Sequence, residues 1–187
     1  MNGLTVHPST SSGRTVKPYF LVVKKLMNSY LLRRTLAIDE ERYGPEHPKV
    51  ANDLNHLAQL LQTTYRLAEA ESLMKRALAI DEKSYGPEHP NVAIRLFNLA
   101  EVLWDANRLP EVEQLRRRHL LIFLKLTHTI GHEHPELRSA FVTYQSILTD
   151  LLHLKPAALN QRLDSLGPEA GYSQEEWQRL RGQLSQN

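Results

Sequence analysis

Apolar residues recur along the middle of the chain at the spacing of one face of an α-helix. A first stripe follows i, i+4, i+7, i+8 and i+11 and consists of Val50, Leu54, Leu57, Ala58 and Leu61. After a short break at 65–67, a second stripe consists of Ala70, Leu73, Met74, Ala77 and Ile80. The pattern predicts two amphipathic helices, called A and B here, that pack against each other as a hairpin.

The same unit is present twice in succession. Residues 34–75 and 76–117 align without a gap, and 23 of the 42 positions are identical. A fixed period of 20–50 residues is typical of stacked arrays, because one such unit is too small to bury its own apolar face. The second copy of helix A repeats the stripe as Val92, Leu96, Leu99, Ala100 and Leu103. We therefore expect an all-α solenoid of antiparallel helix hairpins.

The links between units carry strong helix-ending signals. Gly44 and Gly86 stand where a C-terminal cap is expected, and the Gly-Pro-Glu-His-Pro runs that they open prevent each helix from continuing. Pro110 falls in the first turn of the second helix B, where a missing N–H does no harm. The histidines of these links, His47, His89 and His134, are expected to bond a helix end.

The array is expected to be short. A third unit follows Gly131, but Gln145 replaces the small alanine of its helix A and should crowd or tilt the hairpin. Residues 156–166 predict a short helix B, and Ser173 with Glu176 forms a capping box that opens a last helix.

The N-terminal side lacks half a hairpin. Residues 27–44 match a helix B, and nothing before them resembles its helix A. The exposed side of this orphan helix is covered by Tyr19–Val23, by further repeats of a longer array, or by a second molecule. The expected divisions are a disordered segment 1–16, an array 17–155 and capping helices 156–187. Within the array we expect an orphan helix 20–43, repeats at about 49–85 and 91–128, and a degenerate repeat from 135.

These motifs together resemble the tetratricopeptide repeat of the longer, kinesin-light-chain-like kind. They are Leu-x-x-Leu-Ala at 54–58 and 96–100, Glu-x-Glu at 69–71 and 111–113, Arg-Ala-Leu-Ala-Ile at 76–80, and the Gly-Pro-x-His-Pro turn. The resemblance implies a right-handed superhelical solenoid whose A helices line a concave groove that holds peptide segments. Kinesin light chains usually carry two asparagines in the helix A motif. Each full unit here keeps one of them, Asn55 or Asn98.

The groove should be lined by the row of helix A that lies off the apolar stripe. Amides in one unit beside aromatic residues in the next make a peptide platform, since amides bond an extended backbone and aromatic rings bury side chains. The alternative is that Phe97 and Trp104 pack against a neighbouring hairpin. The candidate peptide-binding residues are Asn52, Asn55, Gln59, Gln62, Ile94, Phe97, Asn98, Glu101 and Trp104.

Composition narrows the functional classes. The chain has 187 residues, a net charge of +2 and no cysteine, which excludes disulfides and thiol catalysis. No run approaches the roughly 20 apolar residues of a membrane span, so we expect a cytoplasmic protein without a membrane partner. Basic residues recur at 33–34, 75–76 and 116–118 and predict a ladder on the B helices. A solvated face is the simpler interpretation, and an acidic partner or weakly bound RNA is the alternative; nucleic acid is disfavoured by the small net charge.

Two further patterns suggest chemistry. His132-Glu133-His134 lacks the i, i+4 spacing of a helical zinc motif, and we expect neither a metal nor another cofactor. The repeated Asp-Glu pairs at 39–40 and 81–82 are expected on the solvated outer part of helix B. No set of catalytic residues is recognisable.

The sequence thus predicts a non-enzymatic scaffold that binds a peptide or protein segment of unknown identity in the concave groove. The alternative is a self-associating regulatory or assembly module, forming a homo-oligomer through the exposed N-terminal helix, or a fragment of a larger multidomain signalling protein.

Overall fold

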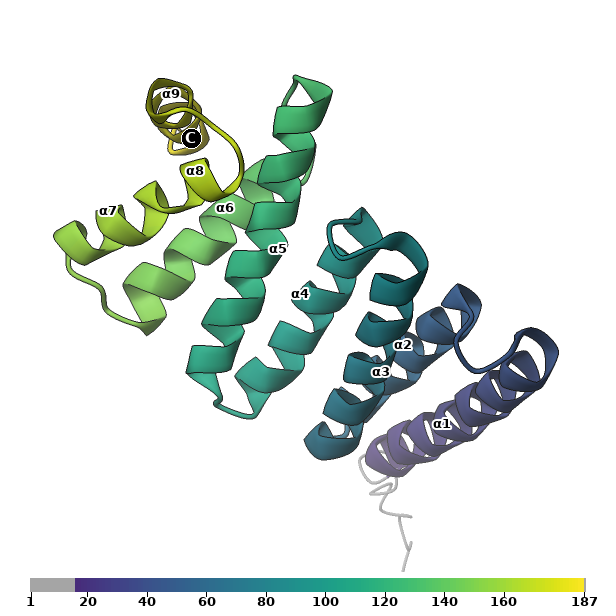
Figure 1. The fold of residues 1–187 in the computed structure, drawn as a ribbon. Coiled ribbons are helices and arrows are strands. Elements are labelled where there is room, and N and C mark those ends of the chain that lie inside the picture. Colours follow the sequence, from purple (N-terminus) through teal and green to yellow (C-terminus); the bar gives the residue numbers. More distant parts are fainter. Residues whose placement is uncertain (1–15, 187) are drawn as a thin grey trace, which may run out of the picture.

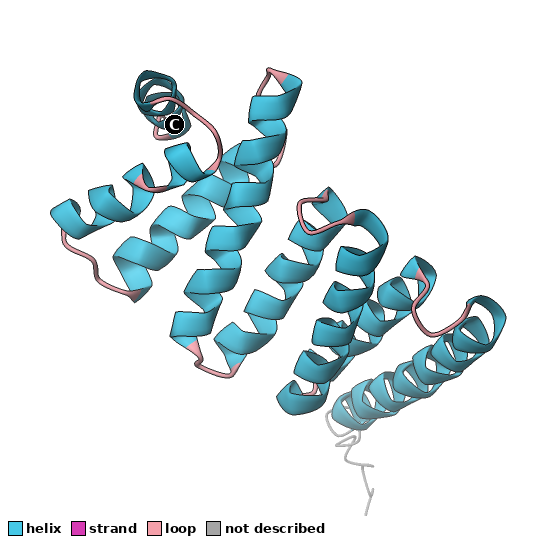
Figure 2. Cartoon of the chain, viewed as in Figure 1, coloured by secondary structure: helices cyan, strands magenta, loops and turns pink. Residues whose placement is uncertain are grey.

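The computed structural model describes residues 16–186, and the side chains of residues 16–22 and 151 are outside this description. The segment expected to be disordered, 1–16, and the side chains of 19–22 therefore lie almost entirely outside the described part. Figures 1 and 2 show a row of helices that follow one another from one end of the molecule to the other. They are α1 (Val16–Tyr43), α2 (Pro48–Gln62), α3 (Leu67–Tyr85), α4 (Pro90–Asp105), α5 (Leu109–Ile130), α6 (Leu137–Ser146), the π-helical turn η1 (Ile147–Leu151), α7 (Pro156–Asp164), α8 (Leu166–Glu169) and α9 (Gln174–Leu184).

Each helix packs mainly on its neighbours in the chain, so that α2–α3 and α4–α5 form the two full hairpins. No strand occurs between residues 16 and 186. The predicted all-α class and the stacked hairpins are thus confirmed. Nor does any described helix reach the length and apolarity needed to cross a membrane.

The links between hairpins form as the sequence predicts. Gly44 and Gly86 adopt φ angles of +89° and +87°, which favour glycine because a Cβ would be strained there. His47 caps the next helix: its Nδ1 accepts a hydrogen bond from the backbone N–H of Lys49 at 3.1 Å. His89 does the same for α4, and its ring stacks on Tyr85 with a centroid distance of 4.6 Å. The turn histidines are therefore structural caps.

The predicted apolar stripes form the core. Every residue of both helix A stripes is at most 3% exposed, and the small Ala58 and Ala100 are completely buried. A methyl side chain at these two positions lets the facing B helix approach closely. The buried residues of α4 and α5 continue into a larger cluster with α6 and the C-terminal helices.

The C-terminal part departs from the regular repeat. Gln145 is half-exposed, and the chain widens into the π-helical turn η1 shortly after it, instead of continuing as a regular helix A. The capping box of α9 is confirmed, since Ser173 Oγ accepts from the N–H of Glu176 and the Glu176 carboxylate accepts from the N–H of Ser173. Trp177 of α9 is buried against Gly167, where a Cβ would lie 2.3 Å from the indole. The last helices therefore share the hydrophobic core of the preceding hairpin.

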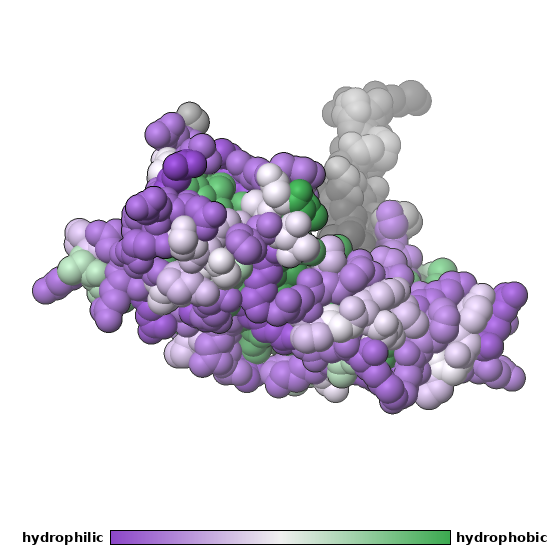
Figure 3. Space-filling view, turned by 45° about the horizontal axis from the view of Figure 1, so that its top comes forward, coloured by the Kyte–Doolittle hydropathy of each residue, from purple (hydrophilic) through white to green (hydrophobic). Residues whose placement is uncertain are grey.

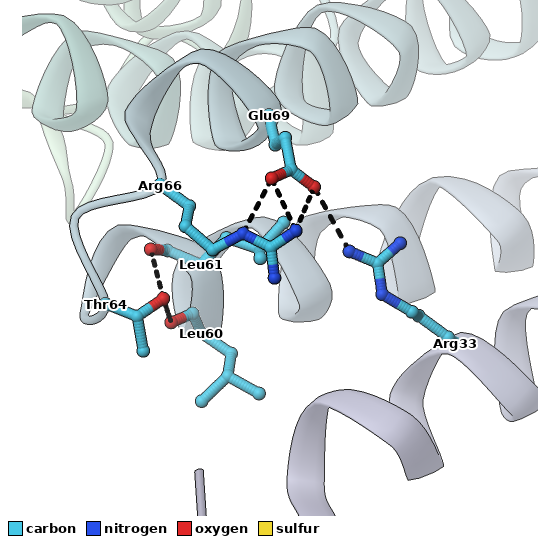
Figure 4. Close-up of polar contacts among 6 residues, drawn as sticks. All are labelled: Arg33, Leu60, Leu61, Thr64, Arg66 and Glu69. Atoms are coloured by element: carbon cyan, nitrogen blue, oxygen red, sulfur yellow. Dashed lines mark hydrogen bonds and ion pairs between the residues drawn. The ribbon is translucent and has the colours of Figure 1, made fainter. Parts of the chain in front are cut away.

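The N-terminal end is held more loosely. Lys25 donates to the carbonyl of Thr63, and Arg33 bonds Glu69 of α3 at 3.2 Å, beside the bidentate Arg66–Glu69 pair (Figure 4). Several large apolar side chains of α1 are nevertheless at least half exposed, namely Val23, Leu26, Met27, Tyr30, Leu31 and Ile38.

Candidate functional site

The candidate groove residues occupy α2 and α4, the A helices of the two full hairpins. On α4 the side chains of Ile94, Phe97 and Trp104 are 51%, 37% and 46% exposed, although each is large and apolar. Exposed apolar side chains that share one helix face are typical of a binding surface. The remaining candidates are more varied: Asn52, Gln59 and Glu101 are exposed, Gln62 and Asn98 are half-buried, and Asn55 is buried.

Four of the predicted amides take part in hydrogen bonds between the two A helices. Asn98 donates to Asn55 at 2.8 Å, and Gln62 donates to Asp105 at 2.7 Å. Because Asn55 is only 5% exposed, it serves this link and is not freely accessible from solvent. The outer amide Asn52 also accepts a hydrogen bond from α4, and its donor is Arg95.

Arg95 belongs to a buried ion pair that the sequence analysis missed. Its Nε bonds Asp81 of α3 at 2.7 Å, and the two side chains are 7% and 1% exposed. The expectation that Asp39 and Asp81 lie on a solvated outer face was therefore wrong, since the residues are 6% and 1% exposed. The sequence contained a signal for this ion pair. A carboxylate on the inward side of a helix B requires a cation within reach, and Arg95 follows Asp81 by fourteen residues.

The contact between α1 and α2 has a different arrangement at the equivalent place. Asp53 of α2 occupies the position of Arg95 and lies beside Asp39 of α1, so two carboxyl groups meet where α3 and α4 share an ion pair. Burial, followed by the neighbouring carboxyl group of Asp39, raises the pKa of Asp53 above its ordinary value. Lys49 supplies part of the missing positive charge, with its Nζ 3.4 Å from Asp39.

The second hairpin also carries buried basic residues in its B helix. Arg116 is 4% exposed, its guanidinium lies 3.7 Å from the ring centroid of Phe97, and it forms an ion pair with Glu101. Its Nε and Nη1 atoms are buried and bond no other described residue. His119, one turn further on, is 8% exposed; burial, with a smaller effect of Arg116, lowers its pKa to about 4.

A cleft of about 650 Å³ opens between α4 and the α6–η1 segment, with Arg116 of α5 in its wall. Trp104 and Val142, both close to half exposed, provide apolar surface on opposite sides. The other lining residues are Glu101, Thr143, Ser146, Ile147 and Asp150. The cleft thus combines an aromatic ring, aliphatic groups and polar groups of both charges, which suits one or two side chains of a bound segment.

The face drawn in Figure 3 is dominated by hydrophilic residues, and hydrophobic ones form small, separate areas. The basic ladder of the B helices is matched by acids: Arg76 pairs with Glu40 and Arg118 with Glu82, each at 2.6 Å. Most of the positive charge expected there is therefore neutralised within the protein.

Within residues 16–186, no group of three or more His, Asp or Glu side chains could hold a metal ion. His134 accepts a hydrogen bond from the N–H of Glu136 in the turn before α6, and its ring packs on Phe123.

The comparisons with known proteins agree with this architecture. The tetratricopeptide repeat family model matches residues 30–83 and 54–124, together half of the chain, and the chain belongs to this family. Tetratricopeptide repeats are generally protein-interaction modules. No curated protein sequence matches the chain.

Two solved structures from Podospora anserina share the fold. Both contain the nearly identical TPR-like repeats of a protein named as a kinesin light chain, one of them as a point variant. The variant is 20% identical with a TM-score of 0.53, covering 90% of this chain and 88% of that one. The other is 21% identical with a TM-score of 0.53, covering 90% and 89%. The resemblance to kinesin-light-chain-like repeats is confirmed for the fold.

Proposed function

We propose that this protein is a non-catalytic scaffold of the cytoplasm, which binds a peptide or protein segment along its A helices. The cleft beside Trp104 is the observation that supports this proposal. The side chains of Trp104 and Val142 are 46% and 47% exposed. Apolar surface in contact with water is unfavourable, and its burial lowers the free energy. A partner side chain that fills the cleft would remove both surfaces from water.

The anchoring role falls to few residues. Trp104 supplies the largest contact area, and rigid aromatic side chains at the centre of an interface carry a large share of binding energy. Ile94 and Phe97 extend the apolar row along α4, one turn apart. Gln59 on α2 and Ser146 on α6 are the accessible polar groups at either side that can bond the backbone of the segment.

The test is a selection of peptides from a displayed random library on the immobilised full-length protein. Selected peptides are then titrated against the wild type and Trp104→Ala. We expect a loss of about 10-fold or more in affinity, as for a central aromatic anchor, with a nearly unchanged Tm. Tyr65→Ala is the matched control, because Tyr65 is an aromatic residue 83% exposed in the α2–α3 turn.

Selection of no peptide, or equal affinity for wild type and Trp104→Ala, would contradict the proposed groove. A large drop in Tm for Trp104→Ala would show instead that the indole is part of the core.

A further inference from the structure

In the two full hairpins, the A helices α2 and α4 cover one face of the B helices α3 and α5. No described helix covers the equivalent face of α1. Ile80 of α3 and Ile122 of α5 are 4% and 3% exposed, because α2 and α4 lie over them. Ile38 occupies the same register of α1, yet it is 51% exposed. The residue type and the repeat position are identical, so the difference arises from the missing A helix. Figure 1 shows α1 at the end of the row, with helices on one side only.

The repeated ion pairs of the array stop at the same place. Arg76 bonds Glu40 and the carbonyl of Pro45 in the preceding helix and turn. Arg118 repeats both contacts with Glu82 and Pro87 one unit later. Arg34 is the equivalent residue of α1, and it forms no ion pair or hydrogen bond with any described residue.

Two further positions of this end carry the opposite charge to their counterparts. Lys83 pairs with Glu46 of the preceding turn, and Lys125 repeats that pair, but the equivalent position in α1 is Glu41. Likewise, Asp53 stands where Arg95 contacts the preceding A helix. Asp53 Oδ2 is buried and bonds no described partner.

The charges of Arg34, Glu41 and Asp53 define which partner could cover the exposed face of α1. The regular unit would place Glu46 against Glu41 and Asn52 against Asp53, which leaves two acids unmatched. A complementary cover therefore needs an acidic residue facing Arg34 and basic residues facing Glu41 and Asp53. This requirement is independent of the apolar area around Ile38.

Other parts of this chain do not meet the requirement. Residues 1–15 are rich in Ser, Thr and Gly and contain no apolar stripe. A symmetric contact of two α1 helices would bring like charges together, since residues 16–38 hold five basic residues and no acid. The opposite end of a second copy is covered by α8 and α9, which pack on α5 and α6.

We propose that the N-terminal end of the array is a docking surface for a helix–turn–helix of another polypeptide. Its second helix lies along α1 as α2 lies along α3 and covers Leu31 and Ile38. An acidic residue of its first helix faces Arg34, and basic residues of its turn and second helix face Glu41 and Asp53. This surface is separate from the cleft at Trp104 and does not depend on it.

The probe for this surface is a synthetic peptide with the sequence of residues 34–62, which forms the equivalent helix–turn–helix on α3. A matched version carries Glu46→Lys and Asn52→Arg and keeps Glu40 for the contact with Arg34. Binding of both labelled peptides to the full chain is measured by fluorescence anisotropy. We expect the matched peptide to bind about 10-fold more tightly than the unmodified one. The like-charge contact of Glu46 with Glu41 and the neutral contact of Asn52 with Asp53 both become ion pairs.

Protein variants locate the binding. Ile38→Asp should abolish binding of the matched peptide, whereas Ile130→Asp, an exposed isoleucine at the far end of α5, should leave it unchanged. Arg34→Glu should weaken binding, and Glu40→Arg in the peptide should restore it.

Equal binding of the two peptides, or no binding of the matched one, would overturn the proposal. So would undiminished binding to Ile38→Asp, since the peptide would then be replacing the chain's own segment on α3. A wild type that sediments as a dimer while Ile38→Asp sediments as a monomer would also overturn it, because a second copy would then cover the face.

Discussion

The two full hairpins, α2–α3 and α4–α5, are built from the same 42-residue unit and differ in what their B helices bury. Met74 and Ala77 fill the core of the first hairpin and are completely buried. Arg116 and His119 stand at the same two positions of the second hairpin and are nearly as well buried. One backbone architecture therefore accommodates either an apolar core or an embedded cation at this point.

The difference is not confined to one residue. Arg116 packs on the ring of Phe97 and pairs with Glu101, and both partners come from α4. The first hairpin has Asn55 and Gln59 at those two positions. Three substitutions thus occur together, and they adjoin the cleft beside Trp104. Differences between copies of a repeat teach more about function than the identities, which serve the core and the turns.

The largest effect should follow from breaking the buried ion pair that joins α3 of the first hairpin to α4 of the second. Arg95→Met leaves Asp81 buried without its cation, and we expect unfolding to become easier by about 3–5 kcal/mol. Urea denaturation followed by circular dichroism measures the change. The control Asp81→Asn combined with Arg95→Met should recover much of the loss; a single variant as stable as the wild type would show that water solvates Asp81.

Placing the equivalent of Arg116 in the first hairpin should lower the free energy of unfolding nearly as much. Met74→Arg places a charge in an apolar core with Gln59 in place of a glutamate, and we expect a loss of about 3 kcal/mol. Adding Asn55→Phe and Gln59→Glu rebuilds the surroundings of Arg116 and should restore part of the stability. If the triple variant is no more stable than Met74→Arg, the three positions are not coupled. The same denaturation experiment measures both variants.

The buried His119 should make the second hairpin sensitive to acid. Its pKa is about 4 in the folded protein against 6.5 for the free side chain, so the unfolded chain binds the proton first. The contribution of neutral His119 to the free energy of unfolding is complete above pH 6.5. It falls as the pH drops toward 4, by about 2–3 kcal/mol in total. His119→Gln should flatten this part of the pH profile of Tm. An unchanged profile would mean that His119 titrates normally.

The smallest effect concerns the two neighbouring carboxyl groups of Asp39 in α1 and Asp53 in α2. The pKa of Asp53 is raised in the folded protein, so its contribution is favourable at low pH and is lost as the pH rises through that pKa. Asp53→Asn should therefore gain stability relative to the wild type as the pH rises from 4 to 7, by about 1 kcal/mol. Asp53→Arg, which copies Arg95, should gain at least as much at pH 7. A difference between Asp53→Asn and wild type that is constant with pH would contradict this interpretation.

Much of the fold could be predicted because repeated local signals agree. The stripes around Leu57 and Leu99, the glycines at 44 and 86 and the capping box at Ser173 each act within a few residues, and their duplication removes ambiguity. The candidate site was less predictable. The helical spacing that placed Trp104 and Ile94 outside the core also placed Asn55 there, although Asn55 is buried against Asn98 of the next hairpin.

The sequence by itself determined that this protein contains an array of tetratricopeptide hairpins, because period, stripe and turn chemistry are properties of the chain along its own length. Only the tertiary structure decided which polar side chains remain available to a partner. Arg95 meets Asp81 and Asn52, and Arg116 meets Phe97 and Glu101, through contacts between separate helices. The distance between helices and the burial of a charge depend on the packed assembly, and these quantities separate a binding surface from a structural link.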